Sequence, residues 1–249
     1  MLLSMLTSGN IQDTIIQLLL SLPIVVMALS VHETAHGYAA WKCGDPTAYN
    51  LGRLTLNPVK HLDPIGTLCM FLVGFGWAKP VPINTRYFRK PKRDMAITSA
   101  AGPLSNFLMG AVFAVLYGVF LAFLEEQLIL FHFGLEGASE FLNKVFYWAA
   151  ILCMFGALIN FTFAFFNLIP IPPFDGSRIF FAFLPTKAYF AIMKYERQIM
   201  MGLLVALLAC SVLWDFSPTA WLANRLSDLI AFPIRDLLLE HVLLPEMFV

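Results

Sequence analysis

Residues 14–37, TIIQLLLSLPIVVMALSVHETAHG, decide the fold, because an apolar run of membrane length leads directly into a pair of histidines. We predict one long helix over 14–41. His32 and His36 are four residues apart, so on a helix both imidazoles project from one face and could hold one zinc ion. Glu33 lies beside them, where its carboxylate could take a proton from a zinc-bound water.

The same three residues also fit a plainer interpretation, in which they form a polar strip at the end of a helix. Ionisable groups at or near membrane depth are costly, and they usually mark a ligand site or a functional pathway. The apolar run before the motif therefore favours a functional site.

The composition indicates a membrane protein. The chain has 249 residues, of which 59% are hydrophobic and 13% are charged, and its mean hydropathy is +0.75. Ordinary soluble domains are about one quarter charged. We predict an all-α polytopic membrane protein with about four to six transmembrane helices in the lipid bilayer. Nothing in the charge pattern suggests a nucleic-acid surface.

The chain reads as a single integral-membrane domain over 1–249. We call the predicted helix over 14–41 the zinc helix. After it we predict spans at 95–124, 145–169 and 198–214, and an amphipathic surface segment at 218–249. We interpret the first apolar run as a retained span, because no basic residue precedes it and no small-residue cleavage signal follows soon after.

Region 42–94 has a different character, with nine Lys and Arg residues against three Asp residues and frequent prolines. Its apolar part, 65–77, is short for a span, so we predict a re-entrant or interfacial segment there. A short true span is the alternative. Strand-like pieces are predicted around 78–84.

Charge predicts the orientation of the chain in the membrane. Region 42–94 is basic, whereas 125–144 holds four Glu residues and one Lys. The positive-inside bias places the basic region in the cytoplasm. At 1.5 Å per residue, His36 lies about 9 Å before Lys42. The active site is therefore expected near the cytoplasmic face.

A catalytic zinc site needs a third protein ligand, and Asp175 is the strongest candidate. It follows a helix broken by prolines, and irregular backbone at membrane depth is tolerated only where it is buried or lines a wet cavity. Alternatively, Asp175 is only the N-cap of the helix after it. His61 is expected at the mouth of the site, Cys43 is a weak candidate, and the four scattered cysteines predict no disulfide framework.

Together these motifs resemble the site-2 protease family of intramembrane zinc metalloproteases, in its compact prokaryotic branch without PDZ or CBS domains. The resemblance runs from about residue 14 to 200 and begins directly at the zinc helix. It rests on the H-E-x-x-H motif, on the later N-x-x-P and D-G of Asn167–Gly176, and on LNP at 56–58, HLDPIG at 61–66, GWAKPVP at 76–82, KRD at 92–94 and AGPLSN at 101–106.

The resemblance implies one zinc ion per chain, held by His32, His36 and Asp175, with Glu33 as the catalytic base. Asn167 matches the asparagine of the family's second motif and is expected to stabilise the substrate or the intermediate. The implied activity is hydrolysis of peptide bonds in or near the transmembrane segments of other membrane proteins, in regulated intramembrane proteolysis. An extended substrate could pair with residues 64–84 by strand addition.

Two other function classes fit parts of the pattern. An ion or proton transporter could use the same ionisable residues as a relay, although the chain shows none of the internal repeats that are common in transporters. A catalytically silent zinc-binding scaffold is the third possibility.

Overall fold

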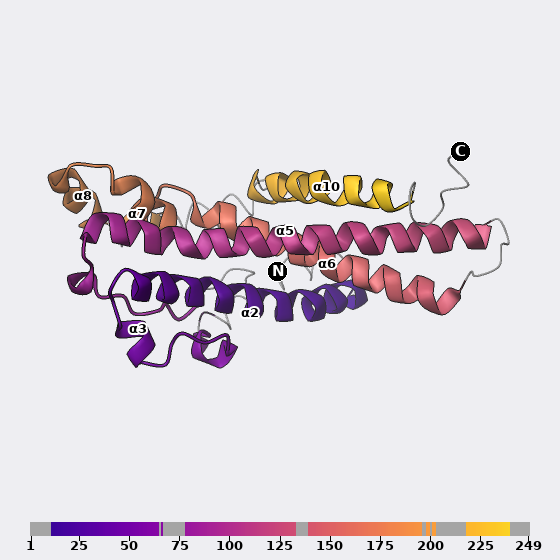
Figure 1. The fold of residues 1–249 in the computed structure, drawn as a ribbon, viewed down its shortest axis with the longest axis horizontal. Coiled ribbons are helices and arrows are strands. Elements are labelled where there is room, and N and C mark those ends of the chain that lie inside the picture. Colours follow the sequence, from indigo (N-terminus) through magenta and orange to yellow (C-terminus); the bar gives the residue numbers. More distant parts are fainter. Residues whose placement is uncertain are drawn as a thin grey trace. The chain divides into compact units, whose positions relative to one another are not determined.

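The computed structural model describes residues 11–64, 66, 78–132, 139–195, 198–199, 201–202 and 218–239, and this part of the chain is helical (Figure 1). The helices are α2 (Ile11–Lys42), α3 (Thr47–Asn50), α5 (Pro91–His132), α6 (Glu140–Asn167), α7 (Asp175–Phe181), α8 (Thr186–Met193) and α10 (Pro218–Leu238), with 3₁₀ turns η1 (Pro58–Lys60) and η2 (Thr85–Tyr87).

Within the described residues, three helices are long and apolar enough to cross a membrane. They are Leu18–Lys42 of α2, Pro91–His132 and Glu140–Asn167. This confirms the prediction of an all-helical, multi-pass chain. The predicted span at 198–214 lies almost wholly outside the described residues, as does the predicted re-entrant segment 65–77.

The membrane helices begin before the predicted spans, and α2 and α5 also end beyond them, whereas α6 ends at Asn167. Helix α5 begins at Pro91 rather than 95, because a carboxylate oxygen of Asp94 accepts a hydrogen bond from the backbone N–H of Lys90 at 2.7 Å. Helix α6 begins at Glu140, which pairs with Lys144 one turn later at 2.6 Å. Apolar runs locate the lipid-facing part of a helix, whereas these caps and ion pairs extend it into polar sequence.

The chain folds as two compact units. The first comprises 1–106 and 163–218, and the second comprises 107–162 and 219–249. In the second unit, Gly118 of α5 lies directly against the backbone of Ala231 in α10. Arg235 of α10 pairs with Glu125 of α5 at 3.2 Å. The C-terminal segment thus contains the predicted helix, whose place at the membrane surface stays a prediction.

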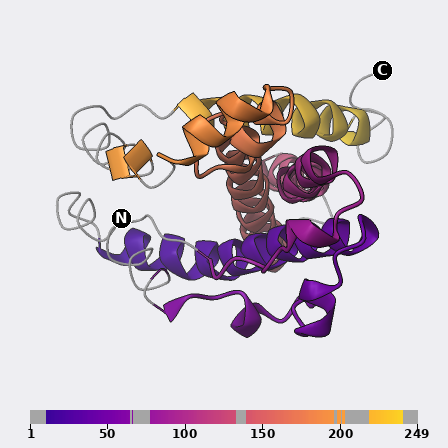
Figure 2. The same ribbon diagram turned by 90° about the vertical axis from the view of Figure 1, so that its left-hand side faces the viewer.

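In the first unit, α3 and the segment after it lie beside the C-terminal part of α2 (Figure 2). Gly37 of α2 permits this packing. A Cβ atom at Gly37 would come within 2.6 Å of Leu54, 3.2 Å of Val81 and 3.3 Å of Ala48. The helix that carries the histidines is therefore covered closely by the polar region that follows it.

The prediction of strand-like pieces at 78–84 is wrong. The described residues contain only one isolated antiparallel bridge, between Leu62 and Ala78. Pro80 and Pro82 have no N–H with which to build a ladder. The remaining polar groups of the backbone in this segment are bonded mainly to side chains from elsewhere in the first unit.

Candidate metal centre

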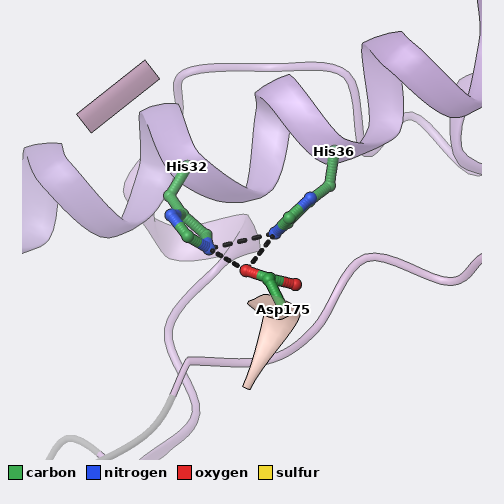
Figure 3. A group of neighbouring side chains, drawn as sticks. All are labelled: His32, His36 and Asp175. Carbon is green, nitrogen blue, oxygen red and sulfur yellow. Dashed lines mark hydrogen bonds and ion pairs between the residues drawn. The ribbon is translucent and has the colours of Figure 1, made fainter. Parts of the chain in front are cut away.

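Two imidazoles of α2 and one carboxylate of α7 meet in the first unit. The two Nε2 atoms of His32 and His36 are 3.0 Å apart. Each Nε2 lies 3.2 Å from the same oxygen, Oδ2 of Asp175. Figure 3 shows both rings extending from one face of the helix toward the aspartate. Among the described residues, this is the one group of three such ligands close enough to share a metal ion.

Asp175 reaches the histidines because of the turn before α7. Phe174 is the N-cap residue of α7, with extended backbone, and Asp175 is the first residue of the helix. The alternative that Asp175 is the N-cap is therefore wrong. A Cβ at Gly176 would collide with the carbonyl oxygen of Leu168, so only glycine allows the chain before α7 to fold back this closely.

The donor set fits zinc. Two imidazole nitrogens and a carboxylate are a common catalytic zinc set, which leaves a fourth position for water. Bond lengths of about 2.0–2.1 Å in a tetrahedron separate neighbouring ligand atoms by about 3.3 Å. The three separations of 3.0, 3.2 and 3.2 Å are close to that value.

One hydrogen bond from Nδ1 fixes the tautomer of each neutral imidazole. Nδ1 of His36 lies 2.7 Å from the backbone oxygen of Thr98, which can only accept, so Nδ1 carries the proton. Nδ1 of His32 lies 2.5 Å from Oδ1 of Asn106, whose Nδ2 donates to the backbone oxygen of Ala28 at 3.2 Å. Both Nε2 atoms therefore present a lone pair to a metal ion.

The histidines are enclosed by α5 as well as by their own helix. His32 and His36 are 6% and 7% exposed, and Asn106 and Thr98 are fully buried. A Cβ at Gly102 of α5 would collide with both imidazole rings. Glycine at this position lets α5 approach closely enough for its Thr98 and Asn106 to orient the two rings.

Asp175 is held in its ionised form. Burial raises the pKa of its carboxyl, but His32 and His36, when their Nε2 atoms are protonated in the metal-free site, outweigh this effect and bring the pKa below its ordinary value. The carboxylate is therefore available as a ligand at neutral pH.

Glu33 is held in place by a backbone donor. Its Oε2 accepts a hydrogen bond of 2.8 Å from the N–H of Val81. The side chain is half-buried on the helix that carries the two histidines. One oxygen of the carboxylate is thus fixed.

The other predicted site residues are bonded to partners outside this group. The Asn167 side chain donates to the backbone oxygen of Phe163 in its own helix at 3.0 Å. His61 is fully buried, with Nε2 2.6 Å from the backbone oxygen of Thr55, so its expected place at the mouth of the site is wrong. Cys43 is not part of the metal group.

No role at the site was assigned to Thr98 or to Asn106 from the sequence. The signal was the cluster AGPLSN at 101–106, where small residues precede one polar side chain on a membrane helix. The role of the Thr98 backbone oxygen could not have been predicted from the sequence, because every residue has a backbone carbonyl.

We expect Asn106→Ala to weaken zinc binding by about 10- to 100-fold, because the ring of His32 loses its orienting acceptor. Isothermal titration of the zinc-free protein in detergent measures this. Asn160→Ala is the matched control, since Asn160 is also fully buried in a membrane helix and its amide donates to Gly156 of that helix. Equal zinc affinity in both variants would contradict the orienting role.

Comparison with known proteins places this geometry in a family. Residues 20–210 match the model of Peptidase family M50. The chain is 37% identical over 194 residues to the "Putative zinc metalloprotease YwhC" of Bacillus subtilis (strain 168), which covers 76% of this chain and 82% of that protein. The chain is 30% identical to the "Putative zinc metalloprotease Rip2" of Mycolicibacterium smegmatis, over 61% of this chain and 52% of that protein. It is 26% identical to the "Putative zinc metalloprotease Rip2" of Mycobacterium tuberculosis strain H37Rv, over 79% of this chain and 70% of that protein. No solved structure matches the chain.

Proposed function

The chain belongs to Peptidase family M50, the site-2 protease family of zinc metalloproteases, and from this premise we propose that it is an intramembrane endopeptidase. Its proposed substrates are membrane proteins, cleaved within or beside a transmembrane segment. The observation that carries the proposal is the group of His32, His36 and Asp175, which lies at the end of a helix long and apolar enough to span a membrane.

We assign the zinc ligands to Nε2 of His32, Nε2 of His36 and the Asp175 carboxylate. Zinc bound there would supply Lewis-acid activation of a water molecule and of the scissile carbonyl. The fixed tautomers of the two neutral imidazoles support this assignment. The transporter and the silent scaffold have no observation in their favour, since the family is one of metalloproteases.

Glu33 is the proposed general base and then the general acid. Its carboxylate accepts a proton from the attacking water and delivers it to the leaving amine of the substrate. The N–H of Val81 holds Oε2, so Oε1 is the oxygen that would exchange the proton. Asn167, at the end of α6, is proposed to stabilise the substrate carbonyl once its amide exchanges its bond to Phe163 for one to the substrate.

A transmembrane substrate hides its carbonyls in its own helical hydrogen bonds, so it must unwind before cleavage. The predicted strand addition has little support at 78–84. The N–H groups of Lys79 and Val81 are bonded to other groups, and Pro80 and Pro82 have none. The predicted pairing with 65–77 lies outside the described residues.

The test is cleavage of a panel of purified single-span peptides by the zinc-loaded protein in detergent, with the cut positions read by mass spectrometry. We expect cuts within or next to the apolar segment, at higher rates where glycine or proline lets that segment unwind. Matched peptides in which these residues are replaced by leucine are the control. Cuts confined to flexible tails far from the apolar segment would show a metalloprotease that is not intramembrane.

A further inference from the structure

The segment from Lys79 to Asn84 is held by groups from several parts of the first unit. The N–H of Lys79 donates to the backbone oxygen of His61 at 2.7 Å. The N–H of Asn84 donates to Oδ2 of Asp45 at 2.6 Å. Between these anchors, the N–H of Val81 donates to Glu33. The segment is therefore fixed at both ends around a single contact with the proposed base.

Val81 is the only residue between Lys79 and Ile83 that can supply this donor, because proline occupies positions 80 and 82. Proline also fixes φ near −65°, which limits how far the segment can bend. Val81 itself is buried. A stiff stretch of backbone therefore presents one N–H to Glu33, and neither adjacent residue has an N–H of its own.

Arg53 is the side chain that binds the carbonyl groups of this stretch. Its Nη2 donates to the backbone oxygen of Lys79 at 2.8 Å and to that of Pro80 at 3.4 Å. Arg53 is only 8% exposed and forms no ion pair with any carboxylate of the described residues. Its Nε is buried and has no hydrogen-bond partner among them.

Burying a guanidinium without a carboxylate is costly, and stability alone does not explain its presence. The carbonyl of Pro80 belongs to the same peptide group as the N–H of Val81. A donor on the Pro80 oxygen therefore fixes the plane of the peptide that points its hydrogen at Glu33. It also polarises that peptide, which strengthens the bond from its N–H.

We propose that Arg53 is a positioning residue for Glu33, acting through the peptide group between Pro80 and Val81. This inference rests on the proposed role of Glu33 as the general base. Arg53 holds the peptide and the peptide holds Oε2 of Glu33, which leaves Oε1 to exchange the proton with the reacting water. Misplacement of a catalytic group by about 1 Å costs on the order of 100-fold in rate.

The test compares kcat, KM and zinc content among variants of the full-length protein in detergent, with one cleaved single-span peptide as substrate. We expect Arg53→Met to lower kcat by about 10- to 100-fold, with KM within about two-fold of wild type and zinc still near one per chain. Arg53→Lys should recover part of kcat, because an ammonium can hold one of the two carbonyls. Arg86→Met, an exposed arginine of the same basic region, should keep the wild-type kcat.

A second pair of variants tests the same peptide without removing the buried charge. Val81→Pro deletes the N–H, whereas Val81→Ala keeps it and removes side-chain atoms only. We expect a lower kcat in Val81→Pro than in Val81→Ala, at equal zinc content. The double variant of Arg53→Met and Val81→Pro should lose little more than either alone, because both act through one contact.

A wild-type kcat in Arg53→Met overturns the proposal. An equal kcat in Val81→Pro and Val81→Ala also overturns it. These two Val81 variants provide the test if Arg53→Met does not fold. Failure of the proposed function is distinguishable. In that case the zinc-loaded wild type cleaves no peptide, or Glu33→Gln cleaves as well as wild type.

Discussion

Glu33→Gln should abolish peptide cleavage while leaving the metal site intact. The amide cannot accept the proton from water, and general acid–base catalysis is worth about 100- to 10,000-fold. Its carbonyl oxygen can still accept the hydrogen bond that Val81 now donates to Oε2, so the fold around it should persist. We expect kcat to fall by about 1,000-fold, with zinc near one per chain and KM little changed.

The measurement is the initial rate of peptide cleavage alongside metal analysis of the same preparation. Glu126→Gln is the matched control, because Glu126 lies in α5 and has no part in the metal group. Zinc retained without cleavage would identify Glu33 as the base. Cleavage by Glu33→Gln at the wild-type rate would contradict that role, and loss of zinc would show that Glu33 supports the metal site instead.

The metal ligands were predictable from sequence because their geometry is largely local. A spacing of four residues places His32 and His36 on one helix face whatever the rest of the chain does. Asp175 was harder to predict, because it lies 139 residues after His36 in the chain. Only the proline-broken helix before it and the family resemblance indicated it as a ligand. The structure confirms the grouping of the three side chains.

The residues that orient the ligands were harder to predict, because their contribution depends on how helices pack. Thr98 acts through its backbone oxygen and Gly102 through the absence of a side chain. Neither leaves a chemical signature in the sequence. The burial of His61 likewise depends on how the basic region folds back on α2, which no local pattern specifies.

Positions 78–84 show why the strand prediction failed. A short stretch with valine and isoleucine next to prolines fits an edge strand as well as an extended segment anchored by side chains. The segment is extended and not paired as a strand because the side chains of Arg53, Asp45 and Glu33 bind its backbone at 79–84. The backbone groups that a neighbouring strand would need are used in holding Glu33 and the segment beside it.

Asp175→Asn should remove zinc more completely than any change outside the three ligands. The side chain loses its charge, and a neutral amide oxygen is a weak ligand beside two imidazoles. Even changes in the groups that orient ligands cost about 10- to 100-fold in metal affinity, so we expect a loss of at least about 100-fold here. Cleavage should be lost in proportion to bound zinc, and excess zinc should restore only part of it.

The zinc dependence of thermal unfolding measures this loss without relying on activity. A ligand present at 100 times its dissociation constant stabilises the folded state by about 2.7 kcal/mol, so a chelator should lower the unfolding temperature of the wild type. Because Asp175→Asn binds little zinc under the same conditions, the chelator should change its unfolding temperature far less. Asp236→Asn, an exposed aspartate of α10 outside the metal group, should respond to the chelator as the wild type does. A full response in Asp175→Asn would contradict the assignment of Asp175 as a ligand, since the two histidines would then hold the metal without it.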